Sequence, residues 1–377
     1  MKIGIDARFF GEAGPGRYVA QLVKHLEELD ETNQYIVYLK KDNYDFYRPR
    51  NKNFQKKLAD YRWYSFSEQI LFLFDLYREN FDLVHFTQIN TPLFYLRPFV
   101  VTTHDTILHE FSMERGNFLR RLAYKLKRWP YFLVFGKNIL FSQKILVPSQ
   151  VTKDDLLGYY RIDPSKIVVT HEAVNHYPSG QRIKADEILD KYGIKKPFLL
   201  CLGSFYPHKN VRRLVEAFRI LKFEKIFSGQ LLLIGRESDF SLSLRREIEI
   251  LGVTDIIFPG AQHRKGYLAD VEVEAILSQA TVYIQPALKE GFGIPPVEAM
   301  VFGVPTAVSD IPCLREMCGS ASAYFDPRRV VDMAGKIKLI LNDESVRNQL
   351  IKNGFENVRR FSWKRMAEQT LAVYKGV

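Results

Sequence analysis

The segment TVYIQPALKEGFGIPPVEAM, residues 281–300, reads as a strand, a turn and the start of a helix in immediate succession. The apolar run TVYIQPA at 281–287 has the length and composition of a buried strand. Two glycines and a Pro-Pro pair follow it, and proline is favoured in the first turn of a helix. Glu290 and Glu298, eight positions apart, flank this turn. The segment therefore predicts a β-α unit with carboxylates close to the end of the strand.

The same alternation of strand and helix recurs along the chain. Apolar runs of strand length occur at 2–6, 35–39, 83–86, 99–104, 144–149, 197–204, 230–235, 255–260, 281–287 and 305–310. Between them, RYVAQLVKHLEEL at 17–29 and NVRRLVEAFRIL at 210–221 have apolar residues at helical spacing. This alternation predicts the α/β fold class, with parallel sheets covered by helices on both faces.

The strands fall into two sets, and the polar segment between them at 176–196 contains Gly and Pro and marks a domain boundary. A chain of 377 residues is also too long for one ordinary hydrophobic core. We therefore expect two doubly wound domains facing each other across a cleft, at 1–178 and 179–355. We expect the last segment, 356–377, to form a helix that returns to the N-terminal domain.

Composition narrows the classes of function. The net charge of +11 suits nucleic acid, an anionic membrane surface or anionic small molecules, and lysines scattered over solvated faces are the alternative explanation. The three cysteines have no metal-ligand spacing, so we expect no metal site and a reducing compartment. No run approaches the roughly 18 apolar residues of a spanning helix. The start, MKIGIDARFF, is not a signal peptide, and we expect a cytoplasmic protein.

Ligands of open parallel sheets bind beyond the carboxyl ends of the strands, so the residues after each strand are the site candidates. We expect Gly291 and Gly293 to adopt positive φ and to let the backbone approach a ligand. The helix start that follows offers free N–H groups to a phosphate. Glu290 in the loop would accept hydrogen bonds from sugar hydroxyls. Glu298, in or near the first helical turn, would hold a vicinal diol such as a ribose.

EGFGIPPVEAM resembles the E-x7-E motif of family 4 glycosyltransferases, which have the GT-B architecture of two Rossmann-like domains. The stretch VFGVPTAVSDIPCLREMCGSASAYFDP at 301–327 is similar to the strand and loop that follow in the family. The resemblance implies that Glu298 binds the ribose of a nucleotide sugar and that Glu290 contacts hydroxyls of the transferred sugar. The residues that it places beside the donor are Gly291, Phe292, Gly293 and Ile294.

A second motif, LGSFYPHKNVRRLVEAF at 202–218, is similar to the family's loop whose basic pair grips the diphosphate. Lys209 is the matching lysine, and the resemblance gives it a catalytic as well as a donor-binding role. Ser204 precedes it in a Gly-Ser turn that borders the donor. His208 stands where many members have arginine, which departs from the family pattern.

Two further loops extend the resemblance within the C-terminal half. GRES at 235–238 matches a loop in which a basic residue is common, so Arg236 is expected to face phosphate. PGAQHRKG at 259–266 matches the segment that holds the nucleotide base through backbone atoms.

The N-terminal half carries two matching motifs. TTHD at 102–105 places His104 near the reacting sugar by resemblance, although a histidine after a strand is as often structural. GEAGPGRY at 11–18 follows the first strand, and its Gly14 and Gly16 resemble a Gly-rich loop beside the donor phosphate and the acceptor. A tight turn explains this pair of glycines as well.

Sugar transfer from a nucleoside diphosphate requires stabilisation of the charge that develops on the leaving group. Lys209, Arg236 and the helix start after Gly293 would supply it. The chain has no plausible Asp-x-Asp site, so we expect a metal-independent enzyme with no cofactor besides the donor substrate. The resemblance implies retention of the anomeric configuration, and the PHKN loop favours a mannosyl donor, GDP-mannose, with rhamnose or glucose donors left open.

Two stretches, FLRRLAYKLKRWPYFLVFGKN at 118–138 and RWYSFSEQILFLFDLYREN at 62–80, combine basic and aromatic residues. Such stretches suit an anionic membrane interface. The alternative is an ordinary helix packed on its own sheet with a solvated basic side. A membrane surface would match a lipid-linked saccharide acceptor in cell-envelope polysaccharide synthesis, with the protein peripheral on the inner face of the cytoplasmic membrane.

Two other functions remain open at this point. One is another enzyme of the GT-B architecture, such as a nucleotide-sugar epimerase or a phosphorylase. An epimerase would act on its substrate without any acceptor, and a phosphorylase would need a cofactor lysine and a much longer chain. A nucleic-acid-binding protein would gather its basic residues and base-stacking aromatics on one module. The charge here is spread along the chain, so we expect no nucleic-acid partner.

Overall fold

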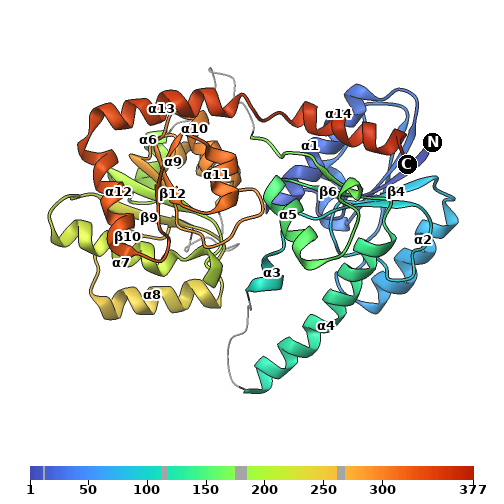
Figure 1. Ribbon diagram of the computed structural model, residues 1–377, viewed down its shortest axis with the longest axis horizontal. Coiled ribbons are helices and arrows are strands. Elements are labelled where there is room, and N and C mark those ends of the chain that lie inside the picture. Colours follow the sequence, from blue (N-terminus) through green and yellow to red (C-terminus); the bar gives the residue numbers. More distant parts are fainter. Residues whose placement is uncertain (12, 112–117, 175–184, 261–267) are drawn as a thin grey trace. The chain divides into compact units, whose positions relative to one another are not determined.

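A computed structural model of the chain describes residues 1–11, 13–111, 118–174, 185–260 and 268–377, with the backbone alone for 13 and 118–127 (Figure 1). The described chain divides into two compact units. The first unit contains Met1–Ala173 together with Ser362–Val377, and the second contains Val174–Phe361. The final segment of the chain thus belongs to the same unit as its beginning.

The first unit is built on a parallel sheet of seven strands in the order β3-β2-β1-β4-β5-β6-β7. The strands are β1 (Lys2–Asp6), β2 (Gln34–Leu39), β3 (Phe54–Leu58), β4 (Leu83–Phe86), β5 (Phe99–Thr102), β6 (Lys144–Val147) and β7 (Ile167–Val169). The chain winds outwards from β1 to β3, then returns to β4 on the other side of β1. The direction of winding therefore switches between β1 and β4.

Helices connect these strands. They are α1 (Ala13–Leu29), α2 (Leu73–Arg78), α3 (Ile107–Glu110), α4 (Phe118–Phe141), α5 (Gln150–Tyr159) and α14 (Trp363–Lys375), with the short turns η1 (Lys41–Phe46), η2 (Glu68–Phe72) and η3 (Pro164–Lys166). The C-terminal helix α14 packs on α1. Its buried Tyr374 hydroxyl lies 2.5 Å from Nδ1 of His85 in β4, and this contact ties the end of the chain to the first sheet.

The second unit has a parallel sheet of six strands in the order β10-β9-β8-β11-β12-β13. The strands are β8 (Phe198–Leu202), β9 (Gln230–Ile234), β10 (Ile256–Ile257), β11 (Val282–Gln285), β12 (Thr306–Ser309) and β13 (Ser322–Phe325). Its helices are α6 (Ala185–Lys191), η4 (Pro207–Lys209), α7 (Val211–Phe223), α8 (Asp239–Leu251), α9 (Asp270–Leu277), α10 (Ile294–Val301), α11 (Pro312–Cys318), α12 (Val330–Asn342) and α13 (Glu344–Val358).

The core of the second unit shows why its strands read as unbroken apolar runs. Leu199 and Cys201 of β8 pack with side chains of α7, α8 and α12 on one face of the sheet. Phe198 and Leu200, from the alternate positions, pack with side chains of α6, α9 and α10 on the other face. Because helices cover both faces, both sets of strand residues are apolar.

The α/β class and the two parallel sheets predicted from the sequence are confirmed. Three strands were not expected, namely β3, β7 and β13. Each lies at an edge of its sheet, where strands are short and often polar. The strand expected over 99–104 ends at Thr102, so His104 follows the strand and does not belong to it. Among the described helices, none is both long and apolar enough to cross a membrane.

Candidate functional site

The second sheet reverses its direction of winding between β8 and β11. The chain goes outwards from β8 to β9 and β10, then returns to β11 on the other side of β8. At such a point the loops that leave two neighbouring strands diverge, and ligands bind in the crevice between them. These loops are 203–210, after β8, and 286–293, after β11. The first contains Lys209 and the second contains Glu290.

The two loops are joined by an ion pair. Lys209 Nζ lies 2.7 Å from Glu290 Oε2. The side chain of Glu290 is 7% exposed and that of Lys209 is 20% exposed, so the carboxylate is withdrawn from water more than the ammonium. Removing an unpaired charge from water costs roughly several kcal/mol. A buried carboxylate such as that of Glu290 therefore needs a cation beside it. The exposed part of Lys209 is available to an anionic ligand.

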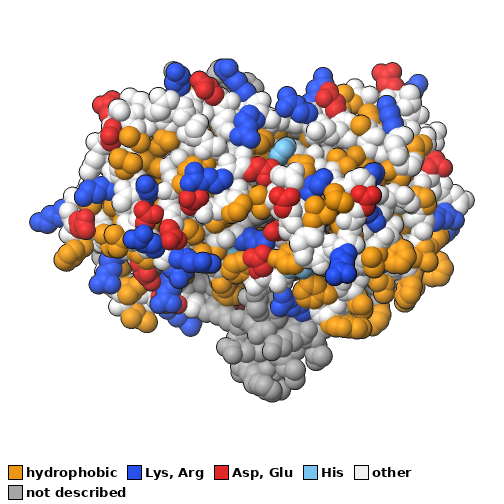
Figure 2. Space-filling model, in the orientation of Figure 1, with side chains coloured by type: hydrophobic (Ala, Val, Ile, Leu, Met, Phe, Trp, Pro, Cys, Tyr) orange, Lys and Arg blue, Asp and Glu red, His pale blue; other side chains and the backbone are white. Residues whose placement is uncertain are grey.

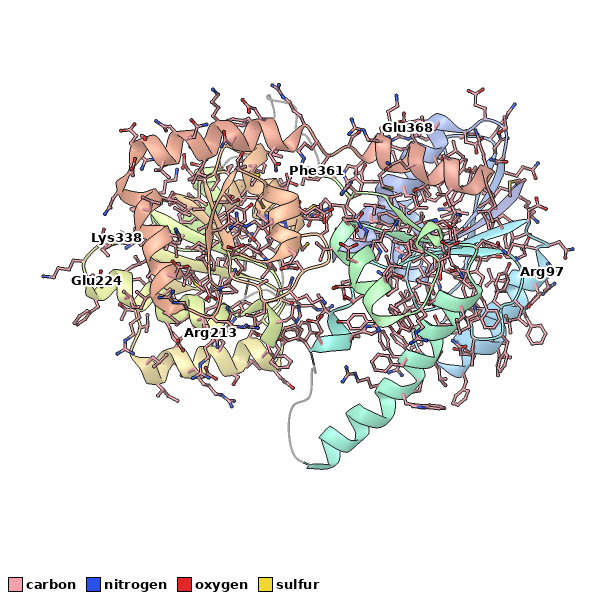
Figure 3. All side chains as sticks on the ribbon, viewed as in Figure 1. Arg97, Arg213, Glu224, Lys338, Phe361 and Glu368 are labelled. Carbon is pink, nitrogen blue, oxygen red and sulfur yellow. The ribbon has the colours of Figure 1, made fainter. Side chains whose placement is uncertain are left out.

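Lys209 is fixed by the residue that follows it. Asn210 has a φ of 58°, in the left-handed region that asparagine tolerates better than most residues. Its side-chain amide donates to the carbonyls of Pro286, at 2.9 Å, and Pro327, at 2.8 Å. Arg213, labelled in Figure 3, donates to Asn210 Oδ1 at 2.8 Å. One buried side chain thus connects the loops after β8, β11 and β13.

His208 makes a second connection between the loops. Its backbone carbonyl accepts a hydrogen bond from Leu288 N at 2.7 Å. Burial lowers the pKa of His208 to about 4, and the charge of Lys209 acts in the same direction. The imidazole is therefore neutral near neutral pH. In the PHK sequence of this loop, Lys209 is the charged residue.

Glu290 is held at its other oxygen as well. Gln285 Nε2 donates to Glu290 Oε1 at 2.5 Å, and the hydroxyl of Tyr283 donates to Gln285 Oε1. Both of these side chains are buried. Sequence reasoning missed Gln285 and Tyr283. The signal that could have found them is a polar side chain, Gln285, at the carboxyl end of an otherwise apolar strand.

The turn after Glu290 leads into helix α10. Gly293 has a φ of 87° and forms the N-cap, so a positive φ is confirmed there. Gly291 is not among the residues with a positive φ, so the same expectation is wrong for Gly291. Glu298 is the fifth residue of α10, directly after the first turn, which agrees with the position expected in or near that turn. Its side chain is half-buried.

Phe292, within this turn, is anchored in the core of the second unit. Its backbone carbonyl accepts a hydrogen bond from Cys313 Sγ at 3.2 Å, and its ring packs edge-on against Phe361 with centroids 5.5 Å apart. Phe292 is 5% exposed, so its ring belongs to the core. Ile294, the first residue of α10, is half-buried.

Ser204 and Arg236 follow neighbouring strands, β8 and β9. The two loops are pressed together where they begin, because a Cβ on Gly235 would lie 1.9 Å from the carbonyl oxygen of Gly203. Ser204 is half-buried and Arg236 is exposed. Lys209 follows β8, which lies next to β11. Arg236 follows β9, which lies one strand further from β11. The base-binding segment expected at 259–266 lies outside the described residues from 261 onwards.

His104 belongs to the first unit. Its Nδ1 lies 2.8 Å from Glu172 Oε1, and its Nε2 lies 3.0 Å from the carbonyl oxygen of Thr87. Both partners only accept, so both ring nitrogens donate and the ring is an imidazolium. Burial alone would lower the pKa of His104, but the hydrogen bond and charge of Glu172 outweigh it and raise that pKa. His104 therefore carries positive charge at the carboxyl edge of the first sheet.

Gly14 and Gly16 lie in the first turn of α1 and not in a loop before it, which corrects the sequence expectation. A Cβ on Gly16 would lie 2.2 Å from the carbonyl oxygen of Phe9, so a packing requirement explains this glycine. Among the described residues, no heavy atom other than those of the adjacent residues and of the helix's own backbone lies within 4 Å of the position of a Cβ on Gly14. Packing therefore gives no reason for glycine at position 14.

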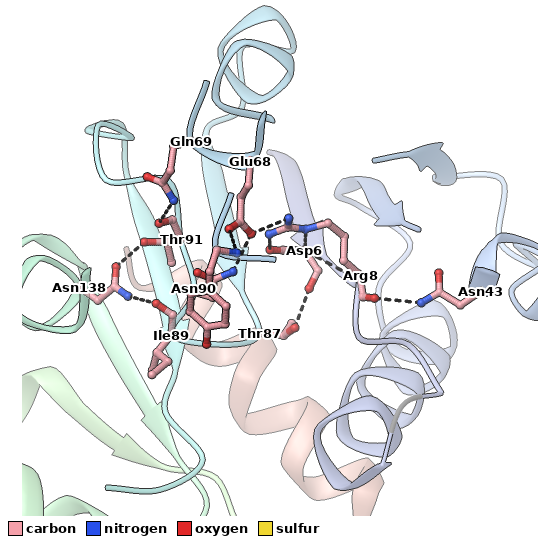
Figure 4. Close-up of polar contacts among 11 residues, drawn as sticks. Asp6, Arg8, Asn43, Glu68, Gln69, Thr87, Ile89, Asn90, Thr91 and Asn138 are labelled. Atoms are coloured by element: carbon pink, nitrogen blue, oxygen red, sulfur yellow. Dashed lines mark hydrogen bonds and ion pairs between the residues drawn. The ribbon is translucent and has the colours of Figure 1, made fainter. Parts of the chain in front are cut away.

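A buried charged cluster marks the switch point of the first sheet (Figure 4). Arg8 donates to both carboxylate oxygens of Asp6, at 2.8 and 2.7 Å, and pairs with Glu68 at 2.7 Å. Thr87 Oγ1 donates to the carbonyl oxygen of Asp6 at 2.6 Å, and Asn90 donates to Glu68 at 2.6 Å. The cluster fixes the loops after β1 and β4 relative to each other. Sequence reasoning missed it.

The described part of the chain contains no group of three or more His, Cys, Asp or Glu residues that could hold a metal ion. The cysteines Cys201, Cys313 and Cys318 are free and buried. Burial raises the pKa of the Cys201 thiol to about 12, so it is not a reactive nucleophile.

Two protein-family models match the chain and together span most of it. The model described as Glycosyltransferase Family 4 matches residues 13–176. The model described as Glycosyl transferases group 1 matches residues 184–357. The first match ends three residues past the division between the two units, which lies after Ala173.

Individual relatives agree with these models. The chain is 26% identical over 327 residues to the O-antigen chain mannosyltransferase RfbU of Salmonella typhimurium, covering 84% of this chain and 82% of RfbU. It is 28% identical to the O-antigen chain mannosyltransferase B of Escherichia coli, covering 62% of this chain and 61% of that protein. The chain thus spans less than two thirds of the latter's length.

Among solved structures, the Anabaena protein HepE in complex with UDP and glucose superposes with a TM-score of 0.76, over the whole of both chains, at 15% identity. At this identity the likeness concerns the fold alone.

The His104–Glu172 pair predicts a pH-dependent stability of the first unit. Because the pKa of folded His104 lies above its usual 6.5, the pair's contribution is fully present below that pH and is lost as the pH rises through the raised pKa. We expect wild type to be more stable than Glu172→Gln at acidic pH, and the difference to shrink towards alkaline pH. Amide hydrogen exchange of the first unit, from about pH 5.5 to about pH 9, measures it. A difference that grows with pH would contradict this assignment.

Proposed function

The chain belongs to the family 4 glycosyltransferases, and on that premise we propose that it moves a mannosyl group from GDP-mannose to a lipid-linked saccharide in cell-envelope polysaccharide synthesis. Two relatives are O-antigen chain mannosyltransferases, which supports the mannosyl donor and the polysaccharide. The observation that carries the proposal is the Lys209–Glu290 pair at the switch point of the second sheet.

In this proposal the donor lies over the loops after β8 and β11. The ammonium of Lys209 and the N-terminal end of α10, after Gly293, face the diphosphate. Glu298 accepts hydrogen bonds from the ribose hydroxyls, and Glu290 accepts them from the transferred sugar. The remaining donor contacts come from Ser204, Arg236, Gly291, Phe292 and Ile294, with Phe292 contributing its backbone because its ring is buried.

Catalysis then consists of stabilising charge on the leaving diphosphate. As the glycosidic bond breaks, negative charge grows on the phosphate oxygen that Lys209 faces, and a fixed cation is most effective at that position. The acceptor oxygen bonds to the anomeric carbon on the face that the phosphate leaves, and its proton passes to the departing phosphate, so the anomeric configuration is retained. No metal ion is needed where the lysine and the helix N-terminus supply the positive charge.

The first unit supplies His104, Gly14 and Gly16 in this proposal. Both nitrogens of His104 are engaged by Glu172 and Thr87, so the ring acts through its positive charge and not as a general base. Gly14 has open space beside its Cα, which permits close approach of a donor or acceptor group.

We also propose that the first unit rests on an anionic membrane, which is where a lipid-linked acceptor resides. An apolar surface supports this, and we call it the aromatic face. Its side chains are each at least half exposed: Phe66, Ile70, Leu71, Phe74, Phe94 and Leu96. Clusters of this kind on a protein surface mark interaction sites. Figure 2 shows hydrophobic side chains gathered at the lower right, where Figure 1 places α2.

Hydrogen bonds join the two segments that carry the aromatic face. Leu93 N donates to Gln69 Oε1 at 2.7 Å, and Gln69 Nε2 donates to the carbonyl oxygen of Thr91 at 3.3 Å. Leu96 N donates to the hydroxyl of Tyr77 at 3.1 Å. The turn η2, helix α2 and the loop after β4 therefore form one continuous surface.

The charges around the aromatic face suit anionic lipid. Arg78 is exposed, and Arg97, labelled in Figure 3, is half-buried beside the face. Two nearby acids are already paired. Asp75 accepts from Tyr61 at 2.6 Å, and Glu79 pairs with Lys2 and Lys57. In the other stretch expected to meet lipid, the side chains of 118–127 lie outside the described residues.

The donor site predicts that its two glutamates affect different quantities, donor affinity for Glu298 and turnover for Glu290. Glu298→Ala should weaken binding of GDP-mannose about tenfold to a hundredfold, because it removes charge-assisted hydrogen bonds to the ribose. Glu290→Ala should lower turnover far more than donor affinity. Calorimetry and nucleotide release, measured over a panel of UDP-, GDP- and dTDP-sugars, give both quantities. Full transfer by both variants would refute the site, and conversion of the nucleotide sugar without any acceptor would favour an epimerase.

The aromatic face predicts salt-sensitive binding to vesicles that contain anionic phosphatidylglycerol. Leu71→Ser combined with Phe74→Ser should reduce co-sedimentation, because each removes an apolar side chain worth about 1.5–3 kcal/mol when buried. Exposed Phe223 in the second unit is the matched control, and Phe223→Ser should leave binding unchanged. If wild type does not sediment with these vesicles at low salt, the membrane proposal is wrong.

A further inference from the structure

The carboxylate of Glu290 is bound by two side chains, Lys209 and Gln285. Only Lys209 is charged, and only Lys209 would also bind the donor. Lys209 contacts Oε2 at 2.7 Å, and Gln285 contacts Oε1 at 2.5 Å. The proposed function, on which this inference rests, requires Lys209 to face the diphosphate. The ammonium then divides its attraction between a carboxylate and a phosphate, whereas the amide of Gln285 has no such competitor.

The orientation of the Gln285 amide is determined by its neighbours. Burial raises the pKa of Tyr283 well above its usual value, so its hydroxyl keeps its proton and donates to Gln285 Oε1. The opposite end of the amide, Nε2, then faces Glu290, which as a carboxylate can only accept. A flipped amide would set oxygen against oxygen. Tyr283 therefore selects the orientation of Gln285 that binds Glu290.

The strand that carries these residues is rigid. Tyr283 and Gln285 are two positions apart in β11, so their side chains lie on the same face of the sheet. β11 pairs on one side with β8 and on the other with β12, where Gln285 lies opposite Val308. Ser309 Oγ adds a hydrogen bond to the Gln285 carbonyl at 3.2 Å. A polar group on such a strand holds its partner more precisely than one on a loop.

We propose that Gln285 is the positioning residue that keeps the Glu290 carboxylate in place when Lys209 engages the diphosphate of the donor, and that Tyr283 sets its orientation. Gln285 itself touches neither donor nor acceptor. Without its amide, Glu290 is fixed by Lys209 alone and follows the ammonium when the phosphate draws it away. The carboxylate then leaves the hydroxyls of the transferred sugar, while the diphosphate and ribose contacts remain.

The test separates turnover from nucleotide affinity. Gln285→Leu keeps the bulk of the side chain and removes the amide. It should lower turnover of GDP-mannose by about a hundredfold, because a displacement of about 1 Å at a reacting centre has an effect of that size. Its affinity for GDP, which lacks the transferred sugar, should stay close to that of wild type. Tyr283→Phe removes one hydroxyl and leaves the amide, so it should lower turnover in the same direction by a smaller factor.

The matched control is Thr306→Val, which removes a buried hydroxyl from the neighbouring strand β12. The Thr306 hydroxyl bonds Ser322 and the carbonyl of Ala321; Thr306 lies opposite Tyr283 in the sheet, but its hydroxyl is not part of the Tyr283–Gln285–Glu290 chain. Thermal unfolding of each variant reports the loss of stability. If Gln285→Leu and Thr306→Val lose similar stability but only the first loses turnover, the positioning role is supported.

Two results would overturn the inference. Turnover of Gln285→Leu equal to wild type means that the amide does not position Glu290, and the proposed function then stands. A parallel loss of GDP affinity and turnover means that Gln285 supports the whole site structurally. If wild type transfers sugar from no nucleotide sugar, the proposed function fails first, and the inference fails with it.

Discussion

The ion pair between Lys209 and Glu290 is the interaction on which the functional account of this chain depends. It brings a cation and a carboxylate together at the one place in the second sheet where the winding direction reverses. Each partner comes from the loop after a central strand, and Asn210 fastens these loops to each other and to the loop after β13. The sheet therefore sets the geometry of the pair, and the loops have little freedom to alter it.

The first unit uses the same principle with different chemistry. Its switch point holds the buried Asp6–Arg8–Glu68 cluster, in which one guanidinium satisfies two carboxylates. Thr87 connects this cluster to His104, because its hydroxyl donates to the Asp6 carbonyl and its own carbonyl accepts from the histidine. Removing one partner of a buried ion pair is strongly destabilising because it leaves the other charge unpaired. The paired cluster therefore holds the loops around it in fixed positions. The positive charge of His104 stands at the end of this chain of contacts.

The sequence predicted the large features well because they depend on local pattern. Apolar runs marked the central strands, and the position of Lys209 and Glu290 after two of these strands brought them to one edge of a parallel sheet. The features that it missed depend on pairing across long separations. Arg8 and Glu68 look like ordinary surface residues until the fold buries them together. Gln285 stands inside an apolar run, and its role becomes visible only when Tyr283 and Glu290 are seen on either side of it. The edge strand β3, FQKKL, carries a glutamine and two lysines between its apolar ends and therefore has no continuous apolar run.

The most direct test of the account is the affinity of the chain for GDP with and without the charge at position 209. Lys209→Met keeps the apolar stem and removes the ammonium, and calorimetry should show affinity reduced about tenfold to a hundredfold. Lys191→Met is the control, because Lys191 is also a paired lysine of the second unit but contacts Glu272 on the surface. Unchanged affinity for GDP in Lys209→Met would mean that the diphosphate does not bind at this ion pair.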